Sequence, residues 1–168
     1  MTPSPTAPAA PSTLDHAFLI ERAVACLEAI RARKPFVLTI TNTVAQHFTA
    51  NGLLAIGAIP CMARNAEEIE AFVESADAVL LNLGTMSAPE FETMRLAAST
   101  CGRTGKPFVL DPVFAERSPK RLALARDLLR AGPAIAKFNA GEAAAMGEDV
   151  RPTTAALDRK STRLNSSH

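Results

Sequence analysis

The sequence predicts an α/β protein, a parallel β-sheet with flanking helices. The main observation is that short apolar, often β-branched runs alternate with longer amphipathic runs between residues 14 and 147, with short connections. This alternation is typical of βαβ crossover units. A second observation is the run Ala78–Leu83, which is apolar except for Asn82, as expected of a central parallel strand covered on both faces. With 168 residues, 48% of them hydrophobic, the chain can bury a sizeable core.

The expected domain covers residues 13–150. Residues 1–12 consist mainly of Pro, Ala, Ser and Thr, without a charge and without the pattern of a secretory signal, so we expect a disordered leader. Residues 151–168 have no periodicity and end in a basic, Ser- and Asn-rich stretch. We expect a disordered tail there, and its last residues resemble a cloning or sequencing scar.

Charge and cysteine content exclude several classes of protein. A net charge of +1 argues against nucleic-acid and membrane-surface partners. No run approaches the roughly 18 apolar residues that a membrane span needs. Cys26, Cys61 and Cys101 are odd in number and lack metal-site spacing, which favours a reducing cytoplasm.

The sequence of the first half of the domain predicts two helix–strand pairs. Residues 14–33 form an amphipathic helix, and Phe36–Ile40 form a strand. A helix then begins at Thr43, which has capping-box spacing to Gln46, and ends at Gly57. Residues 58–62 form a short strand, placed at a sheet edge because it contains a proline.

The second half continues the pattern. Asn65 is expected to cap a helix with a buried apolar stripe and a solvated glutamate face, and Ser87 with Glu90 forms a capping box for the helix after strand 78–83. Strand 108–110 is followed by a helix that opens at Ser118-Pro119 and ends at Gly132-Pro133. Strand 134–138 leads to Asn139, which caps a last helix with Glu142 three residues on.

Polar residues follow several of these strands, at the edge where open parallel sheets hold ligands. Each has a structural alternative to ligand binding. Asn42 and Gly84 can simply turn the chain, and Met62 can fill a core gap. Asp111 can form an Asx turn before Pro112, or bind Mg²⁺. The carboxylate of Glu142 can be used wholly on backbone N–H groups.

The segment Thr41-Asn-x-Val-x-x-x-Phe-Thr-Ala-Asn-Gly-Leu-Leu-Ala-x-Gly-x-x-Pro-x-Met62 resembles hydroxyethylthiazole kinases, which have a ribokinase-like fold. Leu81-Asn-Leu-Gly-Thr85, Leu110-Asp-Pro-Val113 and Lys137-Phe-Asn-Ala-Gly-Glu142 extend the resemblance over residues 14–147. It implies phosphorylation of a thiazole-borne alcohol by ATP with Mg²⁺ in thiamine biosynthesis or salvage. It also implies a homotrimer, with the substrate pocket built across a subunit boundary.

The resemblance assigns roles to particular residues. It places Asn42, Met62 and Gly84 against the thiazole alcohol. It places Lys137, where the family often has Arg, and Asn139 at the ATP phosphates, and Asp111 with Glu142 around Mg²⁺. We therefore expect Asn42 and Asp111 to share one cavity.

Two departures from the family limit what is expected of this chain. Phe114-Ala-Glu-Arg-Ser118 replaces a glycine-rich loop after Asp-Pro-Val. The family's later Thr-Gly-x-Gly-Cys junction, which stabilises the transferring phosphoryl group, has no Gly-x-Gly counterpart between Asn139 and His168. We expect this chain to be the N-terminal portion of such a kinase, with the C-terminal part missing. We also expect it to contain no catalytic residues and to be inactive alone. The alternatives are another ribokinase-like kinase, acting on a pyrimidine or vitamin alcohol, and a non-catalytic fragment.

Overall fold

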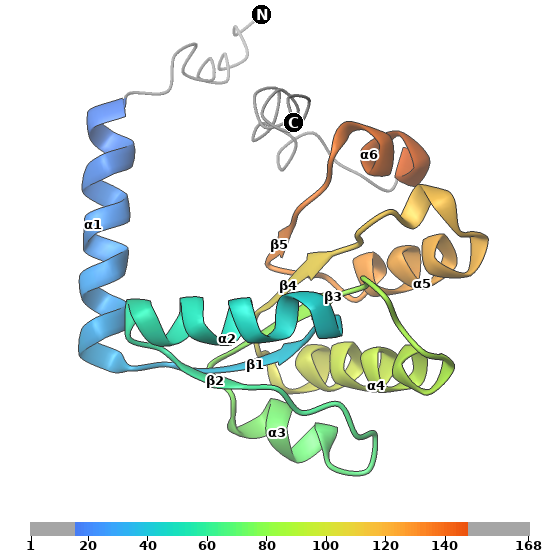
Figure 1. Cartoon of the computed structure of the whole chain (residues 1–168), viewed down its shortest axis with the longest axis horizontal. Helices are drawn as coiled ribbons and strands as arrows, with labels where there is room; N and C mark the ends of the chain where they lie inside the picture. Colours follow the sequence, from blue (N-terminus) through green and yellow to red (C-terminus); the bar gives the residue numbers. More distant parts are fainter. Residues whose placement is uncertain (1–15, 148–168) are drawn as a thin grey trace, which may run out of the picture.

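The structure is a computed structural model of the 168-residue chain, and it describes residues 16–147. The expected leader (1–12) and tail (151–168) lie outside the described residues. The described elements are α1 (His16–Arg33), β1 (Phe36–Ile40), α2 (Thr43–Ile56), β2 (Ile59–Cys61), α3 (Ile69–Ser75), β3 (Ala78–Asn82), α4 (Ala88–Thr104), β4 (Phe108–Asp111), the 3₁₀ helix η1 (Ala115–Arg117), α5 (Pro119–Arg130), β5 (Ile135–Ala136) and α6 (Ala140–Met146) (Figure 1).

The predicted parallel sheet is confirmed. Its five strands are all parallel and lie in the order β2-β1-β3-β4-β5, with β3 at the centre and the proline-containing β2 at an edge, as expected. The register pairs Ile40 with Leu81, and Asn82 with Asp111. The carboxyl ends of β1, β3 and β4 therefore meet at one edge of the sheet.

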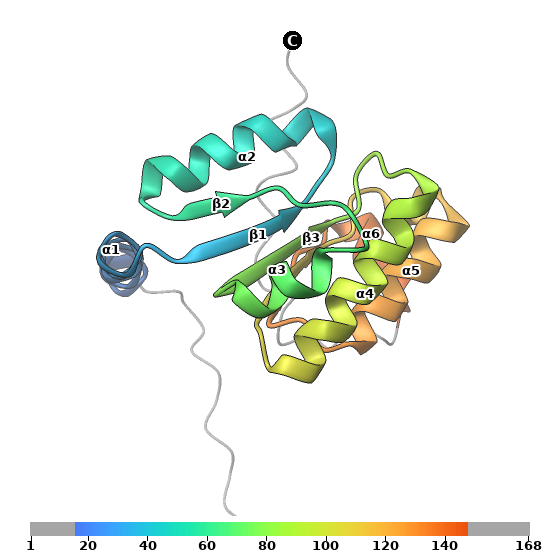
Figure 2. The same ribbon diagram turned by 90° about the horizontal axis from the view of Figure 1, so that it is seen from below.

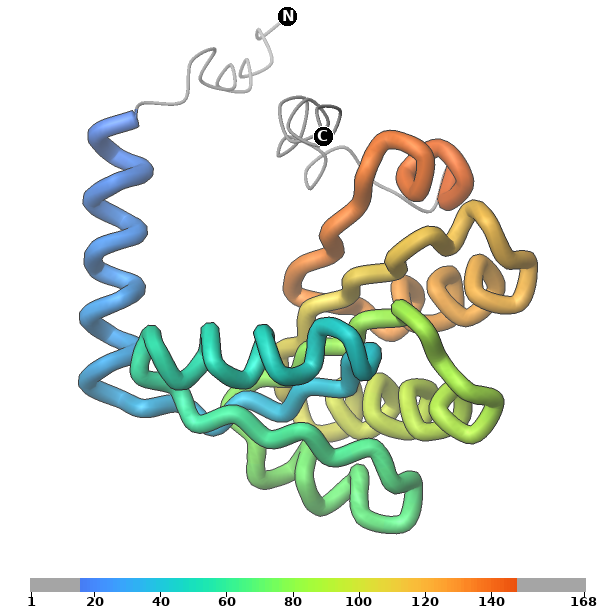
Figure 3. The backbone as a smooth tube through the Cα atoms, in the orientation of Figure 1, coloured from blue at the N-terminus to red at the C-terminus, as the bar shows by residue number. Residues whose placement is uncertain are grey.

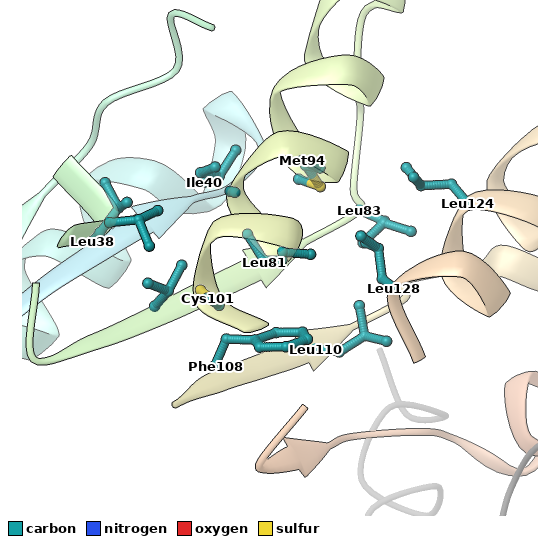
Figure 4. Packing of buried hydrophobic residues seen from close by; sticks show 14 of the residues in the cluster. Leu38, Ile40, Leu81, Leu83, Met94, Cys101, Phe108, Leu110, Leu124 and Leu128 are labelled. Atoms are coloured by element: carbon teal, nitrogen blue, oxygen red, sulfur yellow. The ribbon is translucent and has the colours of Figure 1, made fainter. Parts of the chain in front are cut away.

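The hydrophobic core lies on one face of the sheet, beneath α3, α4 and α5, whereas α2 lies on the other face (Figure 2). Alternate strand residues point to this core: Leu38, Ile40, Leu81, Phe108 and Leu110. Figure 4 shows them packed against Met94 and Cys101 of α4 and against Leu124 and Leu128 of α5. Leu80 and Val109, on the other face, are only half-buried. This second face of β3 is thus covered less completely than the face that carries the core.

The apolar stripe of α1 is not buried. Figure 3 shows α1 (blue) projecting away from the sheet, next to α2. Within the described residues no side chain of α1 is buried, and Phe18, Ile20 and Val24 are more than half exposed. The helix predicted for residues 14–33 is confirmed, and most of its apolar side chains are exposed.

Three local predictions need correction. The N-cap of α2 is Asn42, whose Oδ1 accepts a hydrogen bond from the backbone N of Ala45 at 2.9 Å, so the helix does not begin with a Thr43–Gln46 capping box. Asn65 accepts from the backbone N of Glu67 in a turn, and α3 begins only at Ile69. The last strand is limited to Ile135–Ala136.

One glutamate of α3 is not simply part of a solvated face. Glu70 pairs with Arg103 at 2.9 Å and accepts a hydrogen bond from the buried Thr100, and the hydrogen bond from Arg103 is the main reason why its pKa is lowered. Asp127 of α5 similarly binds Arg95 of α4, which lowers the pKa of that carboxyl group. These pairs join α3 to α4 and α4 to α5.

The three cysteines are free. Cys26 is exposed, whereas Cys101 is buried, and burial raises the pKa of the Cys101 thiol to about 11. Among residues 16–147, none of the helices has the length and hydrophobicity required to cross a membrane.

Candidate functional site

A chain of side-chain hydrogen bonds connects the ends of β1, β3 and β4. Asn42 Nδ2 donates to Asn82 Oδ1 at 3.1 Å, and Asn82 Nδ2 donates to Asp111 Oδ2 at 3.0 Å. Asn82 and Asp111 are register partners on adjacent strands, so their side chains lie on the same face of the sheet. Since Leu81 and Leu110 beside them point into the core, this is the face opposite the core. The structure therefore brings Asn42 and Asp111 together through one intervening residue.

Gly84 lies against this chain of hydrogen bonds. Its backbone N donates to Asn82 Oδ1 at 3.1 Å. A Cβ atom added at Gly84 would lie 2.7 Å from Asn42 Nδ2, closer than a Cβ atom approaches any non-bonded heavy atom. Gly84 is therefore required for close packing of Asn42, whereas a positive φ, found at the following Thr85 (45°), is not the reason for glycine here.

Lys137 adds a positive charge beside Asp111. It follows β5 directly, its backbone N donates to Leu110 O at 2.9 Å, and its Nζ lies 3.4 Å from Asp111 Oδ1. The Lys137 side chain is 71% exposed and the Asp111 side chain 18%. An ion pair this exposed contributes little to stability, so the lysine is free to turn to an anionic ligand.

Asn139 and Glu142 form the capping box expected at the start of α6. Glu142 Oε2 accepts from Asn139 N at 2.8 Å, and Asn139 Oδ1 accepts from Glu142 N at 2.9 Å. The other oxygen, Glu142 Oε1, accepts from Phe114 N at 2.9 Å, and Glu142 is only 3% exposed. The carboxylate thus uses both oxygens on backbone N–H groups, which is the structural alternative raised above.

The segment that replaces the family's glycine-rich loop is held by this glutamate. Phe114 has a left-handed backbone conformation (φ 55°, ψ 32°), the region that favours glycine. Its side chain is 58% exposed. Arg121 NH1 donates to Val113 O at 2.7 Å and secures the other side of the turn. The chain path after Asp111 is therefore compatible with glycine, although this chain has Phe.

Met62 follows β2 and is half-buried. The loop after it is anchored to α4, because Arg64 forms an ion pair with Glu90, which also accepts from the backbone N of Ser87 at 2.6 Å. The expected Ser87–Glu90 capping box is thus present and has an additional partner. Within the described residues, no hydrogen bond connects Met62 to the Asn42–Asn82–Asp111 chain.

A cavity of about 340 Å³ lies elsewhere, at the opposite edge of the sheet, between the end of α4 and the residues before β4 and β5. Its one ionisable amine, Lys106, donates to Ala76 O at 2.7 Å. This cavity brings together no groups suited to catalysis, so the strand ends remain the candidate site.

Asn82 was not predicted as a site residue. Its signal was present in the sequence, since it is the only polar residue in the run Ala78–Leu83. A buried amide in an apolar strand needs hydrogen-bond partners, and here these partners are Asn42, Gly84 and Asp111.

The donor set at this edge fits a magnesium ion shared with phosphate. Mg²⁺ is usually held by one or two protein carboxylates, with water and phosphate oxygens as its other ligands. Asp111 offers such a carboxylate, partly exposed and next to a lysine. Among residues 16–147, no group of three or more His, Cys, Asp or Glu residues could hold an ion by itself.

The fold is that of an α/β protein, and a cluster of hydrogen-bonded polar side chains lies at the carboxyl edge of its parallel sheet, where such proteins commonly bind ligands. A family model described as "Hydroxyethylthiazole kinase family" matches residues 27–166. The hydroxyethylthiazole kinase of Granulibacter bethesdensis is 46% identical over 136 residues, which cover 81% of this chain and 50% of that protein. A probable hydroxyethylthiazole kinase of Agrobacterium fabrum is 43% identical over 127 residues, covering 76% and 52%.

A solved structure of a hydroxyethylthiazole kinase from Pyrococcus horikoshii OT3 has the same fold, with a TM-score of 0.73 and 39% identity. The match covers 75% of this chain and 50% of that one. The chain belongs to the hydroxyethylthiazole kinase family, and it spans about half the length of the relatives it matches.

Proposed function

We propose that this chain contributes the alcohol-binding and metal-binding half of an ATP-dependent kinase that phosphorylates the hydroxyethyl group of 4-methyl-5-(2-hydroxyethyl)thiazole. Family membership supports the reaction. The observation that carries the proposal for these residues is the hydrogen-bonded chain from Asn42 to Asp111, since it joins the position assigned to the alcohol with the position assigned to the metal.

In this proposal Asn42, Met62 and Gly84 bind the thiazole alcohol. Asn42 supplies an amide donor, Met62 an apolar contact, and Gly84 the space in which Asn42 is held. Lys137 binds ATP phosphate as a point charge, and Asn139 orients the start of α6 towards it.

Asp111 is the direct carboxylate ligand proposed for Mg²⁺. Glu142 acts at the metal through water, because it is only 3% exposed and both of its oxygens accept backbone hydrogen bonds, whereas the Asp111 carboxylate is more exposed and has only side-chain partners. A magnesium ion bound here supplies neutralisation of the phosphate charge during transfer.

Three further statements belong to the proposal. A homotrimer is part of the proposal because of the family resemblance, and the exposed apolar side chains of α1 and α2 support self-association of the chain. A cytoplasmic location is supported by the free cysteines, and the absence of nucleic-acid partners by the net charge of +1.

The test uses residues 14–147 of this chain continued through the C-terminal half of the Granulibacter bethesdensis relative. A coupled assay measures ATP consumption with the thiazole alcohol and, separately, with a pyrimidine alcohol of similar size. We expect turnover that depends on the thiazole alcohol and on Mg²⁺, and loss of turnover in Asp111→Asn. Preference for the pyrimidine alcohol would favour a different kinase specificity, because polar contacts in a pocket discriminate strongly between ligands.

A further inference from the structure

Asn82 lies between the two groups that the proposed function assigns to different ligands. Its Oδ1 accepts from Asn42 Nδ2 and from Gly84 N, both at 3.1 Å, and its Nδ2 donates to Asp111 Oδ2 at 3.0 Å. The residue ends the central strand and is 9% exposed. Few substitutions can satisfy all three partners, because the side chain must both accept and donate.

The orientation of both amides is determined by backbone donors. Gly84 N can only donate, so the Asn82 atom facing it is the oxygen. Ala45 N can only donate, so the Asn42 atom facing it at 2.9 Å is Oδ1. Both assignments leave an NH₂ group facing an oxygen, Asn42 towards Asn82 and Asn82 towards Asp111. The donor and acceptor assignments along the hydrogen bonds from Asn42 through Asn82 to Asp111 are therefore consistent with one another.

These assignments limit what Asn42 can offer a ligand. Its oxygen is used in the N-cap of α2, and one hydrogen of Nδ2 is donated to Asn82. Within the described part of the chain Nδ2 has no other acceptor, so one amide hydrogen remains for a ligand. The ligand atom that meets Asn42 is then a hydrogen-bond acceptor, such as the ring nitrogen of a thiazole or an alcohol oxygen.

We propose that Asn82 is a positioning residue of this site, which fixes the Asn42 amide as a donor to the alcohol substrate and ties it to the metal-binding carboxylate of Asp111. The identity of the substrate rests on the proposed function; the positioning of Asn42 does not. Asn82 touches neither ligand and acts through its two neighbours. Loss of its side chain frees the Asn42 amide to rotate and removes a hydrogen bond from Asp111.

The experiment uses the 168-residue chain and four variants, one of which, Asn42→Ala, serves only to assign signals. Asn82→Ala removes both functions of the amide, whereas Asn82→Asp keeps the acceptor for Asn42 and Gly84 and places a second carboxyl group 3.0 Å from Asp111 Oδ2, where the two carboxyl groups must share a proton. Thr100→Ala is the matched control, because Thr100 is a buried polar residue with hydrogen bonds remote from the strand ends. NMR follows the side-chain NH₂ signals of Asn42, assigned by their loss in Asn42→Ala. The same spectra give the affinity for 4-methyl-5-(2-hydroxyethyl)thiazole.

We expect two well-separated Asn42 NH₂ signals in the unmodified chain and in Asn82→Asp, and collapse of the separation in Asn82→Ala. The affinity for the thiazole alcohol falls roughly five- to tenfold in Asn82→Ala, as for one lost hydrogen bond, and is largely restored in Asn82→Asp. Thr100→Ala lowers the melting temperature without changing either quantity.

The outcomes separate the two proposals. Unchanged Asn42 signals and unchanged affinity in Asn82→Ala would overturn the positioning role. Failure of the unmodified chain to bind the thiazole alcohol would count against the proposed substrate, while the Asn42 signals would still decide whether Asn82 positions that amide. If Asn82→Asp does not fold, the comparison of Asn82→Ala with Thr100→Ala gives the answer.

Discussion

At the scale of single residues, the site depends on the absence of a side chain at Gly84. Gly84 is buried, and the volume that a Cβ would occupy is taken by the amide of Asn42. The Asn42 amide cannot simply move away, because it is bonded at both ends, to Ala45 N and to Asn82. A substitution at Gly84 therefore acts on ligand binding through Asn42.

We expect Gly84→Ala to weaken binding of the thiazole alcohol by tenfold or more and to lower stability by about 1–3 kcal/mol, because the Asn42 amide that must shift is hydrogen-bonded to both Ala45 N and Asn82. Titration of the alcohol and urea unfolding measure the two effects. The control is Gly52→Ala, whose Cβ would meet nothing within 4 Å. It lies within α2 and is expected to stabilise the chain by about 0.5–1 kcal/mol without affecting binding. Equal losses of binding in both variants would contradict this account of Gly84.

Phe114 has a left-handed backbone conformation with an exposed side chain. We expect Phe114→Gly to raise the free energy of unfolding by about 1 kcal/mol, because glycine adopts this conformation without steric cost. Phe114→Ala serves as the control, since it removes the same ring but keeps the Cβ and should not stabilise. Urea unfolding at one pH compares the three proteins. A stabilisation of the alanine variant equal to that of the glycine variant would attribute the effect to the ring.

At the scale of elements, α6 is joined to the loop after β4 by a single carboxylate. Glu142 completes the capping box with Asn139 and also accepts from Phe114 N, so one side chain fixes both the start of the helix and the turn that follows Asp111. The two proposed metal-binding residues therefore differ in kind. Glu142 is buried and bonded to backbone N–H groups, whereas the Asp111 carboxylate is bonded only to the side chains of Asn82 and Lys137.

We expect Glu142→Gln to lower stability by about 1–2 kcal/mol, because the amide nitrogen cannot accept one of the two backbone hydrogen bonds. Asp111→Asn is expected to cost less stability, since the amide oxygen still accepts from Asn82, and to abolish Mn²⁺ binding, with Mn²⁺ used as a paramagnetic substitute for Mg²⁺. Unfolding in urea and Mn²⁺-induced line broadening measure the two effects. Loss of Mn²⁺ binding in Glu142→Gln with unchanged stability would instead identify Glu142 as a direct ligand.

The types and order of the elements were predictable because apolar periodicity and capping signals agree in most of them. The Ser87–Glu90 and Asn139–Glu142 capping boxes are confirmed. At Thr43 the prediction failed because Asn42, one residue earlier, has the side chain that reaches the backbone N of Ala45. Two adjacent residues can both be suitable as the N-cap of a helix, and the spacing of residues in the sequence does not decide which of them caps it.

At the scale of the whole molecule, two helices leave apolar side chains uncovered. Val44 and Phe48 on α2 are 84% and 83% exposed, and Phe18, Ile20 and Val24 on α1 are also more than half exposed. The two helices lie next to each other at one end of the structure (Figures 1 and 3). Exposed apolar side chains on adjacent helices favour association of the chain with itself.

We expect the 168-residue chain to elute as a self-associated species, and Val44→Thr with Phe48→Ser to shift it towards the monomer while leaving the melting temperature within a few degrees, because both side chains are exposed. Size-exclusion chromatography with light scattering gives the mass. Ile135→Ser is the control, since Ile135 is 56% exposed but lies in the strand at the opposite edge of the sheet. A sharp monomer peak for the unmodified chain would contradict the expectation.

The site was predictable only in part. Parallel strands made it foreseeable that Asn42, Gly84 and Asp111 gather at one edge, and the structure brings them together. The residue that joins them, Asn82, was not identified, because its role depends on its register partner. The sequence alone does not show that Asn82 lies beside Asp111 on the neighbouring strand.

The pairing of Asn82 with Asp111 makes strand register part of the site itself. Consecutive strand residues point to opposite faces, so a slip of β4 by one position would bring Leu110 or Pro112 beside Asn82 and leave its amide without an acid to bind. Insertions or deletions in the α4–β4 connection, far from any ligand, should therefore disable this edge of the sheet as completely as removal of the carboxylate. Changes to the helices are therefore compatible with this site only if they preserve the register between β3 and β4.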